Sequence, residues 1–124
     1  MIDSWLPFCD APDLAASDPH VDVTFADGRT HRVTVEDQTD AYFLSGFVVR
    51  QSIVGSLPDL PVQTWLRNRT VSLVGFRIDR RGRLVGEAWM PKAGLTAEEF
   101  QLYVRTIAVE CDRFEYLLTG RDVE

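Results

Sequence analysis

The sequence is poor in the residues that build catalytic and metal centres, with only two histidines and two cysteines in 124 positions. His20 and His31 lack further ligands at a spacing that would complete a zinc site. Cys9 and Cys111 are isolated, without the C-x-x-C spacing of redox or zinc motifs. Phosphate-binding glycine loops and nucleophile elbows are also missing. These absences predict a protein that is not an enzyme and that uses no metal or cofactor.

The chain also lacks an excess of basic charge and any long apolar run. Its net charge of −6 at pH 7 argues against a nucleic-acid partner, because phosphate binding requires a basic surface. No segment approaches the ~18 apolar residues of a membrane-spanning helix, so we expect no membrane partner. Residues 1–10 contain Asp3 and Asp10 and no basic region, which predicts no signal peptide, a cytoplasmic location and reduced cysteines.

What the chain does have is the composition of an ordinary globular domain, with 45% hydrophobic and 26% charged residues. Its length is sufficient for a core without disulfide or metal staples. We therefore expect one domain over residues 1–124, in which residues 1–20 form an N-terminal arm or a short helix. Apolar residues in Ile2 to Phe8 favour packing on the domain, and Pro7 permits only a brief helix.

The strongest local signal is a long amphipathic helix that begins after Thr96. Thr96 and Glu99 have the spacing of a capping box, in which each side chain accepts the other residue's backbone N–H. Gly120 stands where a left-handed cap is expected at the end of the helix. Between them, apolar residues recur at steps of three and four and predict one buried stripe: Phe100, Val104, Ile107, Cys111, Phe114 and Leu118.

The first pair of predicted strands, residues 21–25 and 30–35, is joined by Asp27-Gly28. A three-residue loop with Gly28 in the left-handed conformation would place Val21 opposite Val33 and Val23 opposite His31. A two-residue loop would scatter the apolar face, so the bulged turn is preferred.

Three further strands are predicted at residues 41–54, 71–78 and 83–90. A short helix precedes the fourth strand, with Asp59 as cap and an apolar face formed by Val62, Trp65 and Leu66. The element order is then α-β-β-β-α-β-β-α, which predicts an α+β fold: a mostly antiparallel five-stranded sheet with the long C-terminal helix packed on one face.

The last two strands define two faces if Gly82 forms a bulged turn. One face is apolar and includes the small residues Gly86 and Ala88, which leave room for the helix. The opposite face is mixed and is the candidate surface for a protein or peptide partner or for a dimer: Leu73, Arg77, Val85, Glu87 and Trp89. In the alternative, Trp89 lies under the N-terminal arm with Trp5 and Phe8 as a second core.

Six arginines lie close together in an otherwise acidic chain: Arg67, Arg69, Arg77, Arg80, Arg81 and Arg83. Such a run is typical of a solvated loop and strand edge, and the alternative is a contact with an acidic partner.

The element order and the run from Arg83 to Pro91 resemble the YbjN family, which shares its fold with type III secretion chaperones of the Tir-chaperone type. Similar features continue in Gly94-Leu95-Thr96 and in the helix end from Cys111 to Leu118. Here Arg81-Gly82 replaces a common Asp-Gly turn, and Cys111 stands where alanine is frequent. The resemblance implies a dimer-forming α/β domain that binds peptides or proteins. The short, proline-broken N-terminus favours the YbjN-like branch over a secretion chaperone.

The sequence therefore predicts a non-enzymatic, chaperone-like or regulatory module that binds a protein or peptide client and forms a homodimer. Two alternatives are a self-associating structural or regulatory subunit and a small-ligand sensor, which would require a concave apolar pocket.

Overall fold

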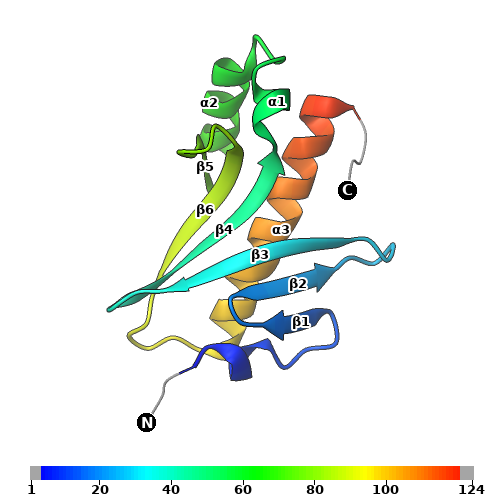
Figure 1. The fold of residues 1–124 in the computed structure, drawn as a ribbon. Coiled ribbons are helices and arrows are strands. Elements are labelled where there is room, and N and C mark those ends of the chain that lie inside the picture. The colour runs from blue at the N-terminus through cyan, green and yellow to red at the C-terminus, as the bar shows by residue number, and fades with distance from the viewer. Residues whose placement is uncertain (1–3, 121–124) are drawn as a thin grey trace.

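The computed structural model of the protein describes residues 4–120, so the predicted role of Ile2 in the arm lies outside the described residues. One sheet, with the strand order β1-β2-β3-β4-β6-β5 and antiparallel pairing throughout, is crossed on one face by a long helix (Figure 1). The predicted α+β class is confirmed. In chain order the elements are η1 (Leu6–Cys9), β1 (Leu14–Ser17), β2 (His20–Thr24), β3 (Thr30–Asp37), β4 (Ala41–Val49), α1 (Gln51–Val54), α2 (Leu60–Thr70), β5 (Gly75–Ile78), β6 (Leu84–Pro91) and α3 (Ala97–Thr119).

The sheet has six strands where five were predicted, because residues 1–20 were expected to form an arm or a short helix and instead contribute β1. Leu14 pairs with Val23 and Ser17 with His20, so β1 forms the outer edge beside β2. Its sequence, Leu-Ala-Ala-Ser, contains no β-branched or aromatic residue, so local propensity gives no strand signal. Pairing with β2 and burial of Leu14 stabilise the strand instead.

Two predicted strands are also too long. The strand expected over residues 41–54 ends at Val49, and Gln51–Val54 form the short helix α1. The strand expected over residues 71–78 begins at Gly75, because Leu73 takes a positive φ of 73° that a strand does not allow.

Both predicted bulged turns are confirmed. Val21 pairs with Val33 and Val23 with His31, and Gly28 has a φ of 91°. The turn between β5 and β6 has Gly82 at a φ of 77° and aligns Phe76 with Gly86. In both loops glycine supplies the left-handed conformation that other residues adopt at a cost.

The helix α3 begins and ends where the sequence predicted. The Thr96 hydroxyl accepts from the Glu99 backbone N–H at 3.2 Å, and the Glu99 carboxylate accepts from the Thr96 N–H at 3.1 Å. Gly120 closes the helix with a φ of 76°. The predicted stripe is buried from Phe100 to Phe114, and Leu118 is half-buried.

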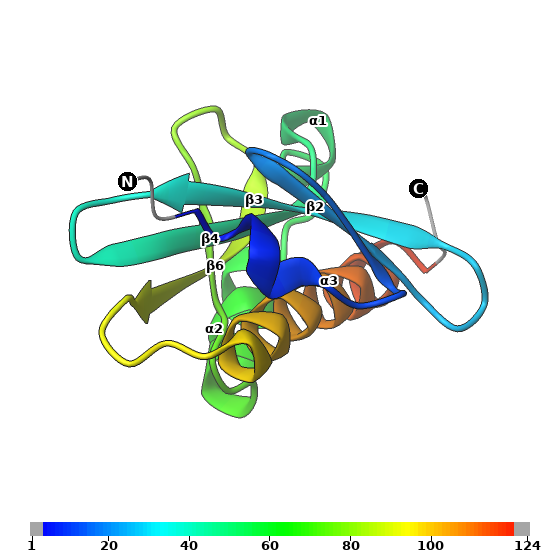
Figure 2. The same cartoon turned by 90° about the horizontal axis from the view of Figure 1, so that it is seen from below.

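The 3₁₀ helix η1 covers the N-terminal end of α3. Trp5 stacks on Phe100 with ring centroids 5.7 Å apart, and the Phe8 ring lies 5.4 Å from the same residue. Figure 2 shows η1 against the start of α3, so this N-terminal segment packs on the body of the domain.

Paired glycines allow α3 to approach the sheet closely. Gly46 on β4 and Gly86 on β6 are cross-strand neighbours beneath the middle of the helix. A Cβ atom on Gly86 would lie 2.7 Å from Cys111 Sγ, and one on Gly46 would lie 2.9 Å from Ile107 Cγ2. Any side chain here would push the helix outward.

We therefore expect Gly86→Ala to lower the free energy of unfolding by ~1–3 kcal/mol, the usual cost of overpacking a core. Gly75→Ala on the neighbouring strand is the matched control, because a Cβ there meets no atom within 4 Å. Urea unfolding of both variants measures the difference, and equal effects would show that the close contact does not exist.

Phe114→Ala should lower the free energy of unfolding by ~3–5 kcal/mol, because Phe114 is buried and its ring meets that of Phe76 edge-on at 4.9 Å. Arg105→Ala on the polar side of α3 should cost at most ~1 kcal/mol. Its guanidinium binds Asp13 through two hydrogen bonds of 2.8 and 2.9 Å, but both side chains are about one-third exposed. Similar losses for the two variants in chemical denaturation would mean that the buried side of α3 is assigned wrongly.

Candidate functional site

The predicted binding residues lie mainly on the face of the sheet away from α3. Val85, Glu87 and Trp89 alternate along β6 with residues buried under the helix, and Arg77 is the cross-strand neighbour of Val85. Leu73 lies apart, in the loop that precedes β5. The structure thus brings four of the five predicted residues together.

An exposed aromatic pair lies at one end of this face. Trp89 is 58% exposed, and its cross-strand neighbour Phe43 on β4 holds its ring 5.1 Å away. The alternative position of Trp89, under the N-terminal arm, is wrong: Trp5 and Phe8 pack on Phe100 on the α3 side. Phe43 was not predicted as a site residue, because β4 and β6 are not joined by a turn and no local signal gives their register.

Farther along the same face, Phe47 is 41% exposed, and the Arg83 guanidinium carbon lies 5.9 Å from its ring centroid. Between the two aromatic ends, Arg77 and Glu87 form an ion pair with nitrogen–oxygen distances of 2.8 and 2.7 Å. We name the whole surface the outer sheet face. It consists of Phe43, Phe47, Arg77, Val85, Glu87 and Trp89.

A pocket of about 560 Å³ opens beside Phe47, between the end of β4, α1 and the end of α3. Its walls are largely apolar, which is the kind of cavity that the small-ligand alternative requires. The lining residues are Phe47, Val48, Val49, Arg50, Ile53, Ser56, Leu57, Glu115, Leu118 and Thr119.

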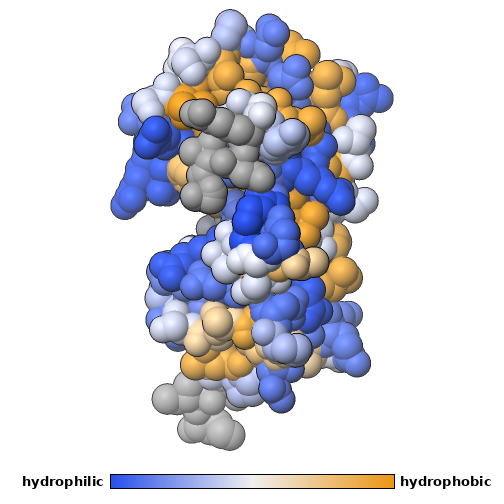
Figure 3. All heavy atoms as spheres, turned by 90° about the vertical axis from the view of Figure 1, so that its right-hand side faces the viewer, coloured by the Kyte–Doolittle hydropathy of each residue, from blue (hydrophilic) through white to orange (hydrophobic). Residues whose placement is uncertain are grey.

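The predicted apolar face of α2 is exposed rather than buried. Val62, Trp65 and Leu66 are 59%, 58% and 46% exposed, and Leu60 is the buried residue of this helix. The Arg69 guanidinium lies 4.8 Å above the Trp65 ring. Hydrophobic surface gathers at this end of the molecule, where Figure 1 places α1 and α2 (Figure 3). We name Val62, Trp65 and Leu66 the α2 face.

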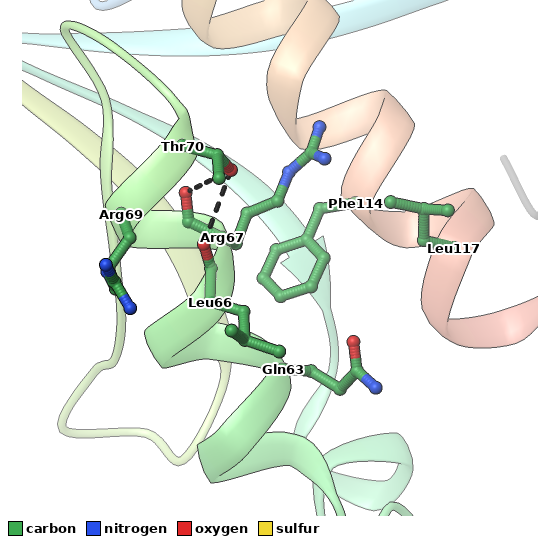
Figure 4. A pocket seen from close by; sticks show the side chains of 7 residues that line it. All are labelled: Gln63, Leu66, Arg67, Arg69, Thr70, Phe114 and Leu117. Carbon is green, nitrogen blue, oxygen red and sulfur yellow. Dashed lines mark hydrogen bonds between the residues drawn. The ribbon is translucent and has the colours of Figure 1, made fainter.

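Two contacts fix α2 in place. Its Asn68 carboxamide binds the edge of β5 as a strand would, accepting from Phe76 N–H at 2.7 Å and donating to Phe76 C=O at 3.0 Å. Arg67 pairs with Glu110 of α3 at 2.7 Å and lies over the Phe114 ring. Figure 4 shows Arg67 and Phe114 side by side in a shallow hollow of about 300 Å³ between the two helices.

Half of the arginine cluster is neutralised locally. Arg67 pairs with Glu110, Arg77 with Glu87, and Arg83 with Asp79. Arg80 and Arg81 are exposed at the β5–β6 turn and form no ion pair with any residue in 4–120. The solvated-edge interpretation therefore describes part of the cluster, and the turn retains two uncompensated charges.

The candidate chemical groups are held in structural roles. His31 Nε2 lies 2.9 Å from the Phe47 carbonyl oxygen, and His20 Nδ1 lies 3.4 Å from the Thr34 hydroxyl. Burial raises the pKa of the Cys9 thiol to about 11 and raises the pKa of Cys111 as well, which disfavours the reactive thiolate. Within residues 4–120, no group of three or more His, Cys, Asp or Glu side chains could hold a metal ion.

Every helix in residues 4–120 is too short or too polar to span a membrane.

No protein-family model and no curated protein sequence matches the chain. Among solved structures, a chain of the heterodimeric ExoU–SpcU complex from the type III secretion system of Pseudomonas aeruginosa matches with a TM-score of 0.65 and 20% identity, over 98% of this chain and 100% of that one. YbjN from E. coli, titled a putative transcription regulator, matches with a TM-score of 0.57 and 17% identity, over 90% and 85%.

The class that these matches define is the fold shared by YbjN and a chain of the ExoU–SpcU complex of a type III secretion system. The fold expected from the sequence resemblance is therefore confirmed.

The turn that carries Arg80 and Arg81 is held by Asp79. Its Oδ1 atom accepts from the Arg81 and Arg83 backbone N–H groups at 2.9 Å, and its Oδ2 atom binds the Arg83 guanidinium. Burial alone would raise the pKa of Asp79, but these hydrogen bonds and the Arg83 charge hold the pKa below its ordinary value.

Asp79 thus contributes stability above its unfolded pKa of about 3.9, and this contribution is lost as the pH falls through the lower folded pKa. We expect Asp79→Asn to destabilise the protein at pH 7 and the deficit relative to wild type to shrink toward pH 3. Asp40→Asn in the β3–β4 turn is the control, because the Asp40 carboxylate has no hydrogen-bond partner in residues 4–120. A deficit for Asp79→Asn that is constant across this range in urea unfolding would contradict the role of the ion pair.

Proposed function

We propose that this protein is a non-enzymatic, chaperone-like module that binds a segment of a client protein on its outer sheet face. The observation that carries the proposal is the exposed Trp89–Phe43 pair on the face of the sheet opposite α3. Exposed apolar surface rimmed by charge is typical of interaction sites, and tryptophan often dominates their binding energy. Two solved structures of this fold class support the proposal, since one is a complex of two proteins and the other is titled a regulator.

The outer sheet face suits an extended client segment. Phe43 and Phe47 are four positions apart on β4, which corresponds to about 13 Å along a strand. Glu87 lies beside Ser45, which is midway between them on β4, and its ion pair with Arg77 offers both a donor and an acceptor to a polar residue of the client. Two apolar contacts separated by one polar contact match the alternation of an extended chain.

Self-association through the α2 face is the second candidate. Three apolar side chains stand exposed on one short helix, and Trp65 is as exposed as Trp89. The Asn68 and Arg67 contacts hold this helix rigidly against the body, so a second copy would meet a preformed surface. This surface supports the expected homodimer without using the outer sheet face.

The two tryptophans provide a matched test, because each is 58% exposed. We expect Trp89→Ala to weaken binding of extended peptides by at least ~2 kcal/mol while the molecular mass is unchanged. Trp65→Ala should leave peptide binding within ~0.5 kcal/mol and shift the mass toward that of the monomer. Fluorescence anisotropy with a peptide library and light scattering after size exclusion measure both quantities.

Thermal unfolding of the same variants separates binding from stability. A large loss of stability in Trp89→Ala with peptide binding intact would contradict the proposed client site. Unchanged mass in Trp65→Ala would remove α2 from self-association.

A further inference from the structure

Four exposed arginines form no ion pair with any residue in 4–120, although the chain carries a net charge of −6: Arg50, Arg69, Arg80 and Arg81. Arg69 lies over the Trp65 ring on α2. Neighbours neutralise further arginines, as Asp22 does for Arg32 and Asp13 for Arg105. Three of the four unpaired residues, Arg50, Arg80 and Arg81, lie near one another.

The three arginines lie at one place because α1 packs against the β5–β6 turn. A Cβ atom on Gly82 would lie 2.9 Å from Gln51 Cγ, so the turn touches the first residue of α1. Arg50 directly precedes α1, and Arg80 and Arg81 directly precede Gly82. All three are thus brought to the same end of the sheet.

The apolar pocket beside Phe47 includes one member of this basic cluster. Arg50 lines the pocket directly, and Arg83, which follows the turn, lies over the Phe47 ring at 5.9 Å. Ile53 of α1 and Leu57, which follows that helix, form the apolar wall on that side. The pocket's acidic lining residue, Glu115, comes from α3 and so marks the opposite wall.

We infer that this pocket takes an apolar side chain of an acidic client segment, whose carboxylates meet Arg50, Arg80 and Arg81. The inference rests on the proposed function and names the class of client that the outer sheet face selects. Phe47 belongs to both surfaces, so one extended segment contacts the Trp89–Phe43 pair and the pocket together. On an acidic protein, an acidic segment is repelled elsewhere, and this restricts productive binding to the arginine cluster.

Three labelled peptides test the inference. They share their apolar residues, including one phenylalanine, and differ only in carrying Glu, Gln or Lys at the remaining positions. By fluorescence anisotropy at low salt, the Glu peptide should bind about tenfold more tightly than the Gln peptide, and the Lys peptide more weakly than both. Raising the ionic strength to about 1 M should remove most of the preference, because exposed charges are then screened.

Substitutions test whether the preference for the Glu peptide comes from Arg80 and Arg81. Arg80→Glu combined with Arg81→Glu should weaken binding of the Glu peptide by about tenfold and change that of the Gln peptide by less than about twofold. Arg69→Glu is the matched control, since Arg69 is exposed on α2 beside Trp65 rather than at the pocket. Leu57→Asp should weaken all three peptides, because it places a charge in the apolar wall. Thermal unfolding confirms that each variant is folded.

The outcomes separate this inference from the proposed function. Equal binding of the Glu and Gln peptides, with a dependence on Trp89, would overturn the acidic specificity and leave the client site standing. Equal losses in the Arg69 and Arg80–Arg81 variants would also overturn it, because the attraction would then come from overall charge. Failure of all three peptides to bind the wild-type protein would count against both the acidic specificity and the proposed client site.

Discussion

The close contact between α3 and the centre of the sheet determines most of this structure. Gly46 and Gly86 leave no side chain between the strands and the helix, so Cys111 and Ile107 rest directly on the backbone of β4 and β6. Because one helix fills this contact, the buried residues of β4 and β6 face α3, and the long helix leaves the opposite side of the sheet uncovered. The exposed Trp89–Phe43 pair is a consequence of that one-sided packing.

The polar side of α3 positions the remaining elements. Arg105 reaches Asp13 before β1, Asp112 binds Arg29 at the end of the β2–β3 turn, and Glu110 binds Arg67 of α2. Partly exposed ion pairs of this kind contribute little to stability individually. Their effect is on geometry: the apolar stripe of α3 stabilises the fold, while its charges fix where the turn, the edge strand and α2 lie. The exposure of the α2 face follows from that placement.

Features set by neighbouring residues were predictable from the sequence, and features set by distant contacts were not. The Thr96 capping box and the Gly28 and Gly82 turns depend on residues within one turn of chain, and all three were predicted correctly. The strand β1 exists because β2 is available to pair with it, and its own residues give no signal. Periodicity likewise identified the apolar face of α2 but could not show that this face is exposed.

Within the candidate site, the alternation along β5 and β6 placed Arg77, Val85, Glu87 and Trp89 on one face. The β4–β6 register that adds Phe43 and Phe47 is a long-range property.

The arrangement of the two candidate surfaces bears on how they would act together. Figure 2 shows α2 and α3 on one side of the strands and α1 on the other, so α2 and the sheet face opposite α3 lie on different sides of the strands. On the proposed function, a second copy on α2 and a client along β4 and β6 would use separate surfaces. Coupling between the two events would then require a change in α3 itself, because allosteric coupling needs an element with two arrangements that both sites bias. The glycine-mediated contact beneath Cys111 opposes such a change, since any shift of the helix opens a gap in a closely packed core. On the proposed function, client binding and self-association are therefore expected to be independent, with the dimer presenting two separate client sites.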